Sequence, residues 1–358
     1  MERFIRRDII HMEGYSPINP LEVLSDIAGI PAESLIKLDG NENPYSCSPR
    51  VRQVLADYPY YHIYPDPEQQ ELRRMLAGYT GVSANSIVAG AGSDELIDLV
   101  LRLFIEPGDK VINCVPTFGI YAFSTGVCGG QVVNVPRDES FAVDIDGVKA
   151  AIDERTKVIF VASPNNPSGN ITAEEDILEL LGTGVVVVID EAYHEFSGVT
   201  AAPLIEEHNN LIILRTFSKW AGLAGLRVGY GFFPPQIAAY LMKIKPPYNV
   251  NSAAQIAVRE SLEDIDYLRG TVEAIIAERE RLFARLEGTG FLKPLPSRAN
   301  FLLCSAPRGQ ARKIHRELQQ IGIFIRYFDT PVLKDFLRIS VGKPEHTDAL
   351  VEALEEIC

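Results

Sequence analysis

The chain has 358 residues, of which 46% are hydrophobic and 23% are charged, a composition typical of a globular enzyme of about two domains. Its 48 acidic and 34 basic residues give a net charge of -14, which disfavours nucleic acid and anionic membrane surfaces as partners. No stretch reaches the ~18 uninterrupted apolar residues of a membrane span, so we expect no membrane segment.

The five cysteines form no CxxC pair, and the six histidines form no metal-binding pair such as HExxH. We therefore expect neither a disulfide framework nor a metal site, and reduced thiols favour a cytoplasmic location. The N-terminal sequence MERFIRRDIIHMEGYSP mixes acids and bases and lacks the apolar core of a signal peptide. We expect a cytoplasmic protein.

Residues 1–45 are predicted to form an N-terminal arm that is rich in turn formers and ends at LDGNENPYS. Residues 50–80 have helical patterns at their two ends. The segment between them, YPYYHIYPDPEQQ, contains three prolines, which exclude a helix interior, together with a cluster of tyrosines. Such an aromatic loop either packs on its own chain or contributes to a site.

Residues 86–104 predict a short strand, a glycine turn and a helix. The two turn glycines resemble the start of a dinucleotide-binding motif, but Glu95 stands where its third glycine belongs, and no P-loop motif occurs. This argues against NAD and ATP. Ser93 and Asp94 begin the helix, where backbone N–H groups form an anion site or where the two residues act only as a cap.

Apolar strands alternate with helical segments as far as residue 231. This alternation predicts an α/β fold with a mostly parallel sheet flanked by helices, which binds its ligand beyond the carboxyl ends of the strands. The residues expected at those ends are chemically diverse and are not needed for core packing: Ser93, Asp94, Phe118, Asn166, Asp190 and Lys219.

The pattern changes after two consecutive prolines at positions 246 and 247. Long helices are predicted over 252–288, and two further helices over 309–321 and 345–357, with strands between them. We therefore expect a second, smaller α+β domain. The predicted division is an arm with part of the small domain (1–45), a large domain (46–245) and a small C-terminal domain (246–358).

Lys219 follows an apolar run that predicts a strand buried on both faces. Lysine forms Schiff bases with carbonyl compounds, and partial desolvation lowers its pKa toward a useful range. Arg227, farther along, offers a fork of donors suited to a phosphate. Alone, the pair also fits a surface lysine and a structural arginine, so its meaning depends on the rest of the chain.

Asp190 ends the apolar run VVVVI, where a carboxylate is costly unless it caps a helix or meets a positive partner. A pyridinium nitrogen is such a partner, and its proton would let the ring accept electrons. Tyr193 and Asn166 would then donate to the phenolate oxygen of the ring, Phe118 would stack on its face, and Lys219 would hold its aldehyde carbon. These roles describe pyridoxal 5'-phosphate, with its phosphate held by Ser93, Asp94, Ser218 and Arg227.

The segments NNPSGN, IDEAYHEF and RTFSKWAGLAGLRVGYG resemble the fold-type-I aminotransferases, which use pyridoxal phosphate. Four others, LDGNENPYS, YPDP, PTFGIY and LRISVG, are similar to the histidinol-phosphate aminotransferases within that group. The resemblance runs from about Tyr15 to the final helix. It implies a large domain with a mostly parallel sheet and a smaller α+β domain.

The resemblance also implies the roles of individual residues. Lys219 matches the Schiff-base lysine, Asp190 the partner of the ring nitrogen, and Asn166 with Tyr193 the donors to the ring oxygen. Tyr64 matches a tyrosine that reaches the cofactor phosphate of the neighbouring subunit, which implies a homodimer. The other matches are Phe118 on the ring face, Ser93, Asp94, Thr216, Ser218 and Arg227 at the phosphate, and Tyr15, Asn43, Arg326 and Arg338 on the substrate side.

The resemblance implies that Arg338 is the arginine that binds the α-carboxylate of the amino acid. For Arg326, a surface arginine with no role in the site is an equally good interpretation of the sequence. The implied reaction converts histidinol phosphate and 2-oxoglutarate into imidazole-acetol phosphate and glutamate. Two alternatives remain on the same fold, an aminotransferase for aromatic amino acids and a phosphothreonine decarboxylase. A transcription regulator built on such a domain is disfavoured by the short arm and the acidic charge.

Overall fold

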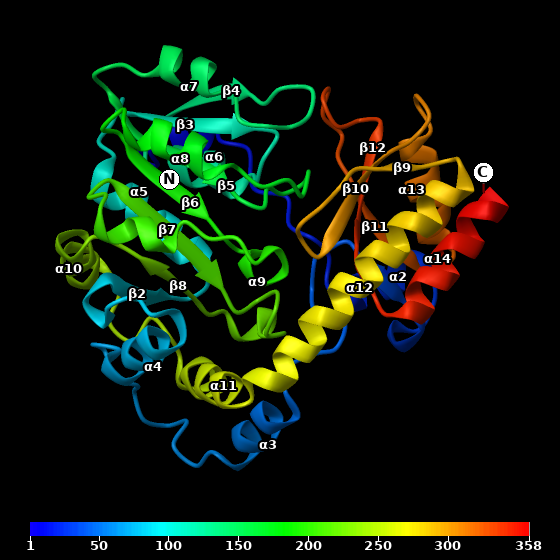
Figure 1. Ribbon diagram of the computed structural model, residues 1–358, viewed down its shortest axis with the longest axis horizontal. Coiled ribbons are helices and arrows are strands. Elements are labelled where there is room, and N and C mark those ends of the chain that lie inside the picture. The colour runs from blue at the N-terminus through cyan, green and yellow to red at the C-terminus, as the bar shows by residue number, and fades with distance from the viewer. Residues whose placement is uncertain (358) are drawn as a thin grey trace.

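The computed structural model describes residues 1–357 and has two lobes, each built on its own sheet (Figure 1). In the larger sheet, β8 is antiparallel to both neighbours and all other pairs are parallel, which confirms the predicted α/β class. The strand order is β2 (Ile87–Gly90), β8 (Gly229–Phe232), β7 (Leu211–Thr216), β6 (Val186–Asp190), β5 (Thr156–Ala162), β3 (Lys110–Val115) and β4 (Gln131–Pro136).

The central strands of this sheet are mainly apolar because they supply two cores, one on each face of the sheet. In β7, Leu211 and Ile213 pack into one core, whereas Ile212 and Leu214 pack into the other. Successive side chains of a strand point to opposite faces, so a strand covered on both faces is apolar at every position. One face is covered by α5 (Ser93–Phe104), α6 (Ile120–Val127) and α10 (Pro235–Ile244), and the other by α4 (Gln70–Thr80), α7 (Ile145–Ala151) and α8 (Glu174–Leu181).

The smaller lobe contains the second sheet and agrees with the predicted α+β architecture. Its first strand comes from the N-terminal segment and pairs in parallel with its neighbour, while the other pairs are antiparallel. The strand order is β1 (Ile36–Leu38), β11 (Ile323–Tyr327), β12 (Phe336–Ser340), β10 (Phe301–Ser305) and β9 (Lys293–Pro294), and the helices are α13 (Ala311–Gln320) and α14 (Pro344–Ile357).

Two consecutive helices, α11 (Ser252–Glu263) and α12 (Ile265–Thr289), join the lobes (Figure 1). The first packs against α3 (Pro49–Asp57) and α4 of the larger lobe, and the second packs against β9, β10 and α14 of the smaller lobe. The boundary at residue 246 stays a prediction. We propose a later boundary, inside α12, because α11 packs with the larger lobe.

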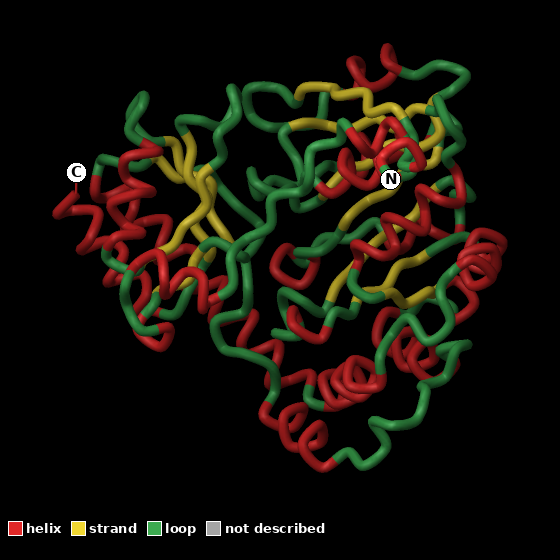
Figure 2. Tube along the Cα trace, turned by 180° about the vertical axis from the view of Figure 1, so that it is seen from behind, coloured by secondary structure: helices red, strands yellow, loops and turns green. Residues whose placement is uncertain are grey.

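Seen from behind, the two sheets lie on either side of a region of loops (Figure 2). Within residues 1–357, no helix is both long enough and apolar enough to cross a bilayer. The remaining elements are the short helices α1 (Arg7–Ile10), α2 (Leu21–Ala28) and α9 (His194–Ser197), and the 3-10 turns Glu2–Phe4, Ala32–Ser34, Ala84–Ser86, Ala202–Glu206 and Ala224–Leu226.

Candidate active site

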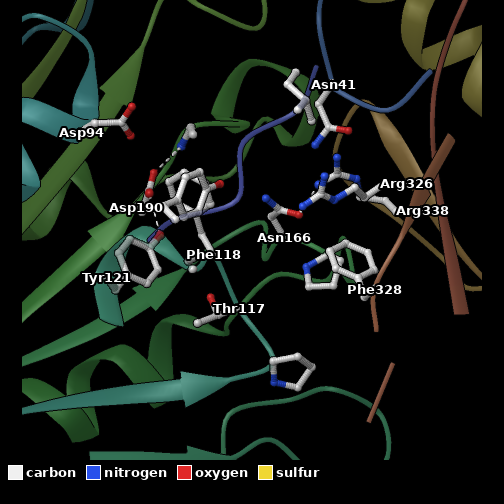
Figure 3. Close-up of a pocket in the computed structure, with 18 of the residues that line it drawn as sticks. Asn41, Asp94, Thr117, Phe118, Tyr121, Asn166, Asp190, Arg326, Phe328 and Arg338 are labelled. Carbon is white, nitrogen blue, oxygen red and sulfur yellow. Dashed lines mark hydrogen bonds between the residues drawn. The ribbon is translucent and has the colours of Figure 1, made fainter. Parts of the chain in front are cut away.

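A cavity of about 1070 Å³ lies at the carboxyl ends of the large-sheet strands. In Figure 3, Asp190 and Phe118 lie on one side of it, and Arg326 and Arg338 of the smaller lobe lie on the other. The lining brings together most residues that the sequence singled out: Tyr15, Ser93, Asp94, Phe118, Asn166, Asp190, Tyr193, Thr216, Ser218, Lys219, Arg227, Arg326 and Arg338.

Two predicted residues lie outside the lining. The side-chain amide of Asn43 donates to the backbone carbonyl of Trp220 at 2.8 Å, so it holds the loop and does not face the cavity. The ring of Tyr64 is 78% exposed and stacks on Tyr248 with a centroid separation of 4.6 Å. The structure therefore corrects the expected substrate-side placement of Asn43, and Tyr64 does not line the cavity of its own chain.

Asp190 forms the floor of the cavity and is 4% exposed. It accepts hydrogen bonds from the Tyr121 hydroxyl at 2.6 Å and from the backbone N–H of Ala192 at 3.0 Å, both uncharged donors. Burial raises the pKa of Asp190 to about 6, because desolvation disfavours the carboxylate. A cationic ligand group at this position would therefore be strongly favoured.

Tyr121 was not identified from the sequence. Its ring is fully buried and stacks on Phe160 with a centroid separation of 4.7 Å. It lies on the first turn of α6, and its ring meets the ring of Phe118, just before the helix, edge-on with a centroid separation of 5.7 Å. Both residues line the cavity. In the sequence, closeness to Phe118 is a weak signal, since nothing local shows that the Tyr121 hydroxyl reaches Asp190.

Lys219 follows β7 and turns its amine into the cavity. Its Nζ donates to the carbonyl of Gly40 at 3.1 Å. Burial, together with the positive charge of Arg338, lowers the pKa of Lys219 to about 8. A lysine with this pKa supplies a useful fraction of neutral amine near pH 7, as a nucleophile or a base requires.

A group of donors suited to an anion surrounds the start of α5. Arg227 has a φ of 55° and pairs with Asp94 at 2.8 Å. Gly92, just before the helix, has a φ of 83°, a conformation that glycine adopts without strain. The hydroxyls of Thr216 and Ser218 lie 3.0 Å apart and also line the cavity. With the free N–H groups of the helix start, this set fits a phosphate.

Arg338 and Arg326 occupy opposite positions on the antiparallel strands β12 and β11. Arg338 is 6% exposed, and its Nη atoms donate to Asn166 Oδ1 at 2.6 Å and to the backbone carbonyl of Asp39. Its Nε is buried and has no hydrogen-bond partner among residues 1–357. Burial lowers the pKa of Arg338 to about 10, and the charge of Arg326 acts in the same direction. Two facing cations held by neutral oxygens form a receptor for an anion.

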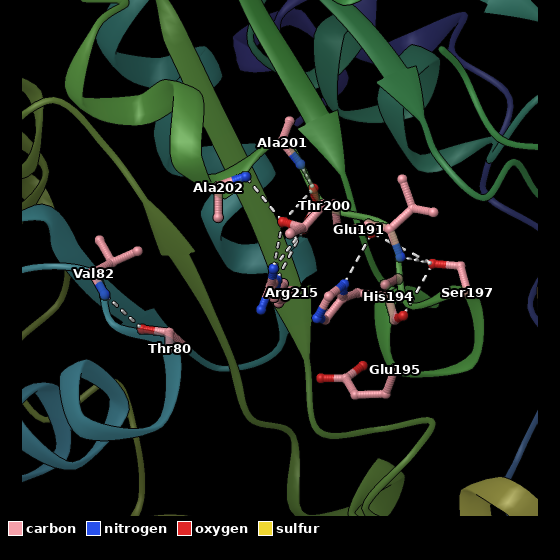
Figure 4. Close-up of polar contacts among 12 residues, drawn as sticks. Thr80, Val82, Glu191, His194, Glu195, Ser197, Thr200, Ala201, Ala202 and Arg215 are labelled. Atoms are coloured by element: carbon pink, nitrogen blue, oxygen red, sulfur yellow. Dashed lines mark hydrogen bonds and ion pairs between the residues drawn. The ribbon is translucent and has the colours of Figure 1, made fainter. Parts of the chain in front are cut away.

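Glu191 follows Asp190 in the chain but is not part of the cavity lining. Its carboxylate accepts from Arg215 Nε at 2.9 Å and from the backbone N–H of Ala201 at 2.6 Å (Figure 4). The Thr200 hydroxyl donates to this carboxylate and accepts from Arg215 Nη2. The ion pair is buried, because Arg215 is 4% and Glu191 2% exposed. Two adjacent acids therefore belong to different clusters.

Known proteins share this architecture along the whole chain. The pattern of the family "aminotransferase class I and II" matches residues 33–354. The chain is 51% identical over 357 residues to a histidinol-phosphate aminotransferase of Dehalococcoides mccartyi, covering 100% of this chain and 98% of the relative. It is 44% identical over 358 residues to the chloroplastic histidinol-phosphate aminotransferase 1 of Arabidopsis thaliana, covering 99% and 86%.

The crystal structure of histidinol-phosphate aminotransferase from Sinorhizobium meliloti in complex with pyridoxal-5'-phosphate is similar, with a TM-score of 0.90 and 30% sequence identity. The match covers 99% of this chain and 97% of that one. Identity of this extent across the full length, together with the family pattern, shows the family. The chain belongs to the class I and II aminotransferases.

Proposed function

We propose that this aminotransferase moves the amino group of histidinol phosphate to 2-oxoglutarate, giving imidazole-acetol phosphate and glutamate, as a step in histidine biosynthesis. The names of relatives that are 51% and 44% identical support this assignment. The observation that carries it is the facing pair Arg326 and Arg338, which lies in the same cavity as Lys219 and Asp190. This pair fits the anionic group that each of the two amino donors carries.

The cofactor of the proposed reaction is pyridoxal 5'-phosphate, which the relative from Sinorhizobium meliloti binds. When bound, its ring withdraws electrons from the substrate carbon, most strongly with the ring nitrogen protonated. Asp190 fits that nitrogen because the carboxylate is buried and has only neutral donors. The other residues that would hold the cofactor are Tyr193 and Asn166 at the ring oxygen, Phe118 at the ring face, and Ser93, Thr216, Ser218 and Arg227 at the phosphate.

Lys219 Nζ is the group that takes the proton from the α-carbon of the substrate and later returns it. Two features of the site suit this work. Burial brings its pKa to about 8, so the neutral amine is available near pH 7. The carbonyl of Gly40 fixes the amine at 3.1 Å, which limits the positions from which it can move a proton.

One cavity must accept two different substrates. Histidinol phosphate carries a phosphate and no α-carboxylate, whereas glutamate carries two carboxylates and no phosphate. A guanidinium binds either anion through two parallel hydrogen bonds. Arg338 is therefore proposed as the contact shared by both half-reactions, and Arg326 as the second contact.

The test is a half-reaction assay that follows the absorbance of the bound cofactor with histidinol phosphate, phenylalanine and phosphothreonine in parallel. Faster conversion with histidinol phosphate supports the proposal, and preference for phenylalanine would indicate an aromatic aminotransferase. Release of CO2 from phosphothreonine, without a glutamate-dependent step, would indicate the decarboxylase.

Borohydride reduction and peptide mapping should label Lys219, and a label on another lysine would refute its role.

We further propose that the enzyme is a homodimer in which Tyr64 reaches the cofactor phosphate of the partner subunit. In support, Tyr64 is 78% exposed, and its neighbours Tyr60, Tyr61 and Ile63 are each more than half exposed, as expected of a surface that a second copy covers. Inactive Lys219→Ala and inactive Tyr64→Ala chains re-formed as hybrids would regain activity at one site. Failure to regain activity would contradict a shared site.

The cytoplasmic location is likewise a proposal, supported by the cysteine pattern.

A further inference from the structure

Residues 39–41, which we call the strap, run between the lobes and hold groups from both. The carbonyl of Asp39 accepts from Arg338, and the carbonyl of Gly40 accepts from Lys219 at 3.1 Å. The carbonyl of Asn41 accepts from the Asn300 side chain at 3.0 Å. Three successive carbonyls thus accept from an arginine in β12, a lysine in the loop after β7, and an amide in the residue just before β10. The position of the strap therefore bears on two site residues at once.

Asn41 is the best-fixed residue of the strap. It is 1% exposed and has a φ of 53°, a left-handed conformation that most residues avoid and that asparagine tolerates. Its N–H donates to Ser340 Oγ, and its Oδ1 accepts from the same hydroxyl, both at 2.8 Å. Its Nδ2 donates to the Tyr193 hydroxyl at 2.9 Å. With the bond to Asn300, every polar group of Asn41 has a partner in the protein.

These contacts determine the direction of the Tyr193 hydroxyl. The Ser340 hydroxyl oxygen accepts from the backbone N–H of Asn41, and the one proton of that hydroxyl is donated to Asn41 Oδ1. Because the amide oxygen of Asn41 faces Ser340, its amide nitrogen faces Tyr193 and donates to the Tyr193 hydroxyl. Tyr193 is 5% exposed and its hydroxyl oxygen is then an acceptor on the Asn41 side. The phenolic proton is left for an acceptor in the cavity, which Tyr193 lines.

We propose that Asn41 is a positioning residue that makes Tyr193 a hydrogen-bond donor into the cavity, toward the ring oxygen of the cofactor. The inference rests on the proposed function for the identity of that acceptor. It assigns Asn41 a role that acts through Tyr193, because the amide oxygen of Asn41 accepts from Ser340 and its amide nitrogen donates to Tyr193. It also explains why asparagine occupies a left-handed position: glycine would suit the backbone conformation equally well, but it has no amide to donate to Tyr193.

The test measures the pH at which the visible absorbance of the bound cofactor changes. A donor to the ring oxygen favours the deprotonated form, so its loss raises that pH. Tyr193→Phe should raise it by about one to two units, since a hydrogen bond to a charged oxygen contributes roughly that much. Asn41→Gly keeps the left-handed backbone and removes the amide, and it should raise the transition by about half a unit. Asn41→Ser, which is too short to reach Tyr193, should act likewise.

In the Tyr193→Phe background, Asn41→Gly should cause no further shift, because its effect passes through the hydroxyl. Asn300→Ala is the matched control, since it removes another bond to the strap without touching Tyr193 and should leave the transition in place. The inference would be overturned if Asn41→Gly shifted the pH of the absorbance transition equally in the Tyr193 and Tyr193→Phe backgrounds. A shift of this pH in Asn300→Ala would overturn it as well. These readings do not depend on the substrate, so an enzyme inactive toward histidinol phosphate would refute only the proposed function.

Discussion

Two buried arginines show how differently this protein uses the same side chain. Arg215 lies behind the cavity, where it forms a 2.8 Å ion pair with Glu191 (Figure 4). Burial acts to lower the pKa of Arg215, but the nearby carboxylates outweigh it and hold the pKa above its ordinary value. Arg338 lies in the cavity, binds only neutral oxygens, and has a pKa lowered to about 10 by burial (Figure 3).

The difference separates structural charges from functional ones. A buried ion pair is balanced within the fold, and removing one partner leaves the other without compensation. A buried charge without a counter-charge is costly to the folded state, and it is retained where a ligand supplies the opposite charge. By this criterion Asp190, Lys219 and Arg338 form the active site, and Glu191 with Arg215 forms its support.

The sharpest contrast lies between the adjacent acids Asp190 and Glu191. Asp190→Asn should slow amino transfer by about 10²–10³-fold, since the ring nitrogen loses its carboxylate, without lowering the free energy of unfolding. Glu191→Gln should instead destabilise the protein by about 3–5 kcal/mol, because Arg215 is left buried and unpaired. Denaturant unfolding and half-reaction rates measured on both variants decide the matter. Near-normal turnover in Asp190→Asn, or undiminished stability in Glu191→Gln, would break the comparison.

The pH dependence of stability offers a second measurement. The folded-state pKa of Asp190 is about 6, above its ordinary value of 3.8, so the folded protein binds this proton more tightly than the unfolded chain does. Its contribution to stability is therefore complete below about pH 4 and is lost as the pH rises through about 6, by about 3 kcal/mol in all. The measurement is the free energy of unfolding of the cofactor-free wild-type protein minus that of the cofactor-free Asp190→Asn variant, taken from below about pH 4 to above about pH 6. A difference that stays constant with pH would show that Asp190 is not an uncompensated buried acid.

The sequence contained enough to predict the floor of the cavity. Asp190 ends β6 and Lys219 follows β7, and each strand begins with an apolar run that packs into the two cores. Because β6 and β7 are parallel neighbours, both residues lie at the same edge of the sheet. The position of such residues depends on strand ends, which apolar runs mark clearly. The fold class could be predicted for the same reason.

The loops could not be predicted in the same way. LDGNENPYS contains two asparagines two positions apart, and the sequence favoured Asn43, whereas Asn41 is the one in the cavity. The choice depends on the left-handed φ of Asn41 and on contacts with Ser340 and Tyr193, which are distant in the chain. Tyr121 was missed for the same reason, since its hydroxyl bond to Asp190 joins helix α6 to the end of β6, 69 residues farther along the chain.

Arg338→Lys tests the functional arginine itself. Lysine keeps the charge but loses the two parallel donors, so both half-reactions should weaken by about 1–3 kcal/mol. The free energy of unfolding should change little, because no ion pair is broken. Stopped-flow rates with histidinol phosphate and with glutamate give the two values. If only the glutamate rate fell, the two substrates would not share this contact, and the phosphate would need another site.

The smallest effect is expected at Arg326, the outer member of the facing pair. Its only described hydrogen bond is a long one, 3.4 Å, to the carbonyl of Ser16, so it is held more loosely than Arg338. A phosphate carries more charge than one carboxylate, and it gains more from a second guanidinium. Arg326→Ala should therefore slow the histidinol phosphate half-reaction by about 1 kcal/mol more than the glutamate half-reaction, and leave the cofactor spectrum unchanged.

The matched control is Arg312→Ala in α13. This arginine contacts the neighbouring strand β11, over the ring of Tyr327, but is not part of the cavity lining. It pairs with Asp329 on the surface, where ion pairs contribute little. Both half-reactions should keep their rates in this variant. Equal losses with both substrates in Arg326→Ala would show that the outer arginine does not discriminate between them, and no loss at all would make it a surface residue and leave Arg338 as the single anion contact.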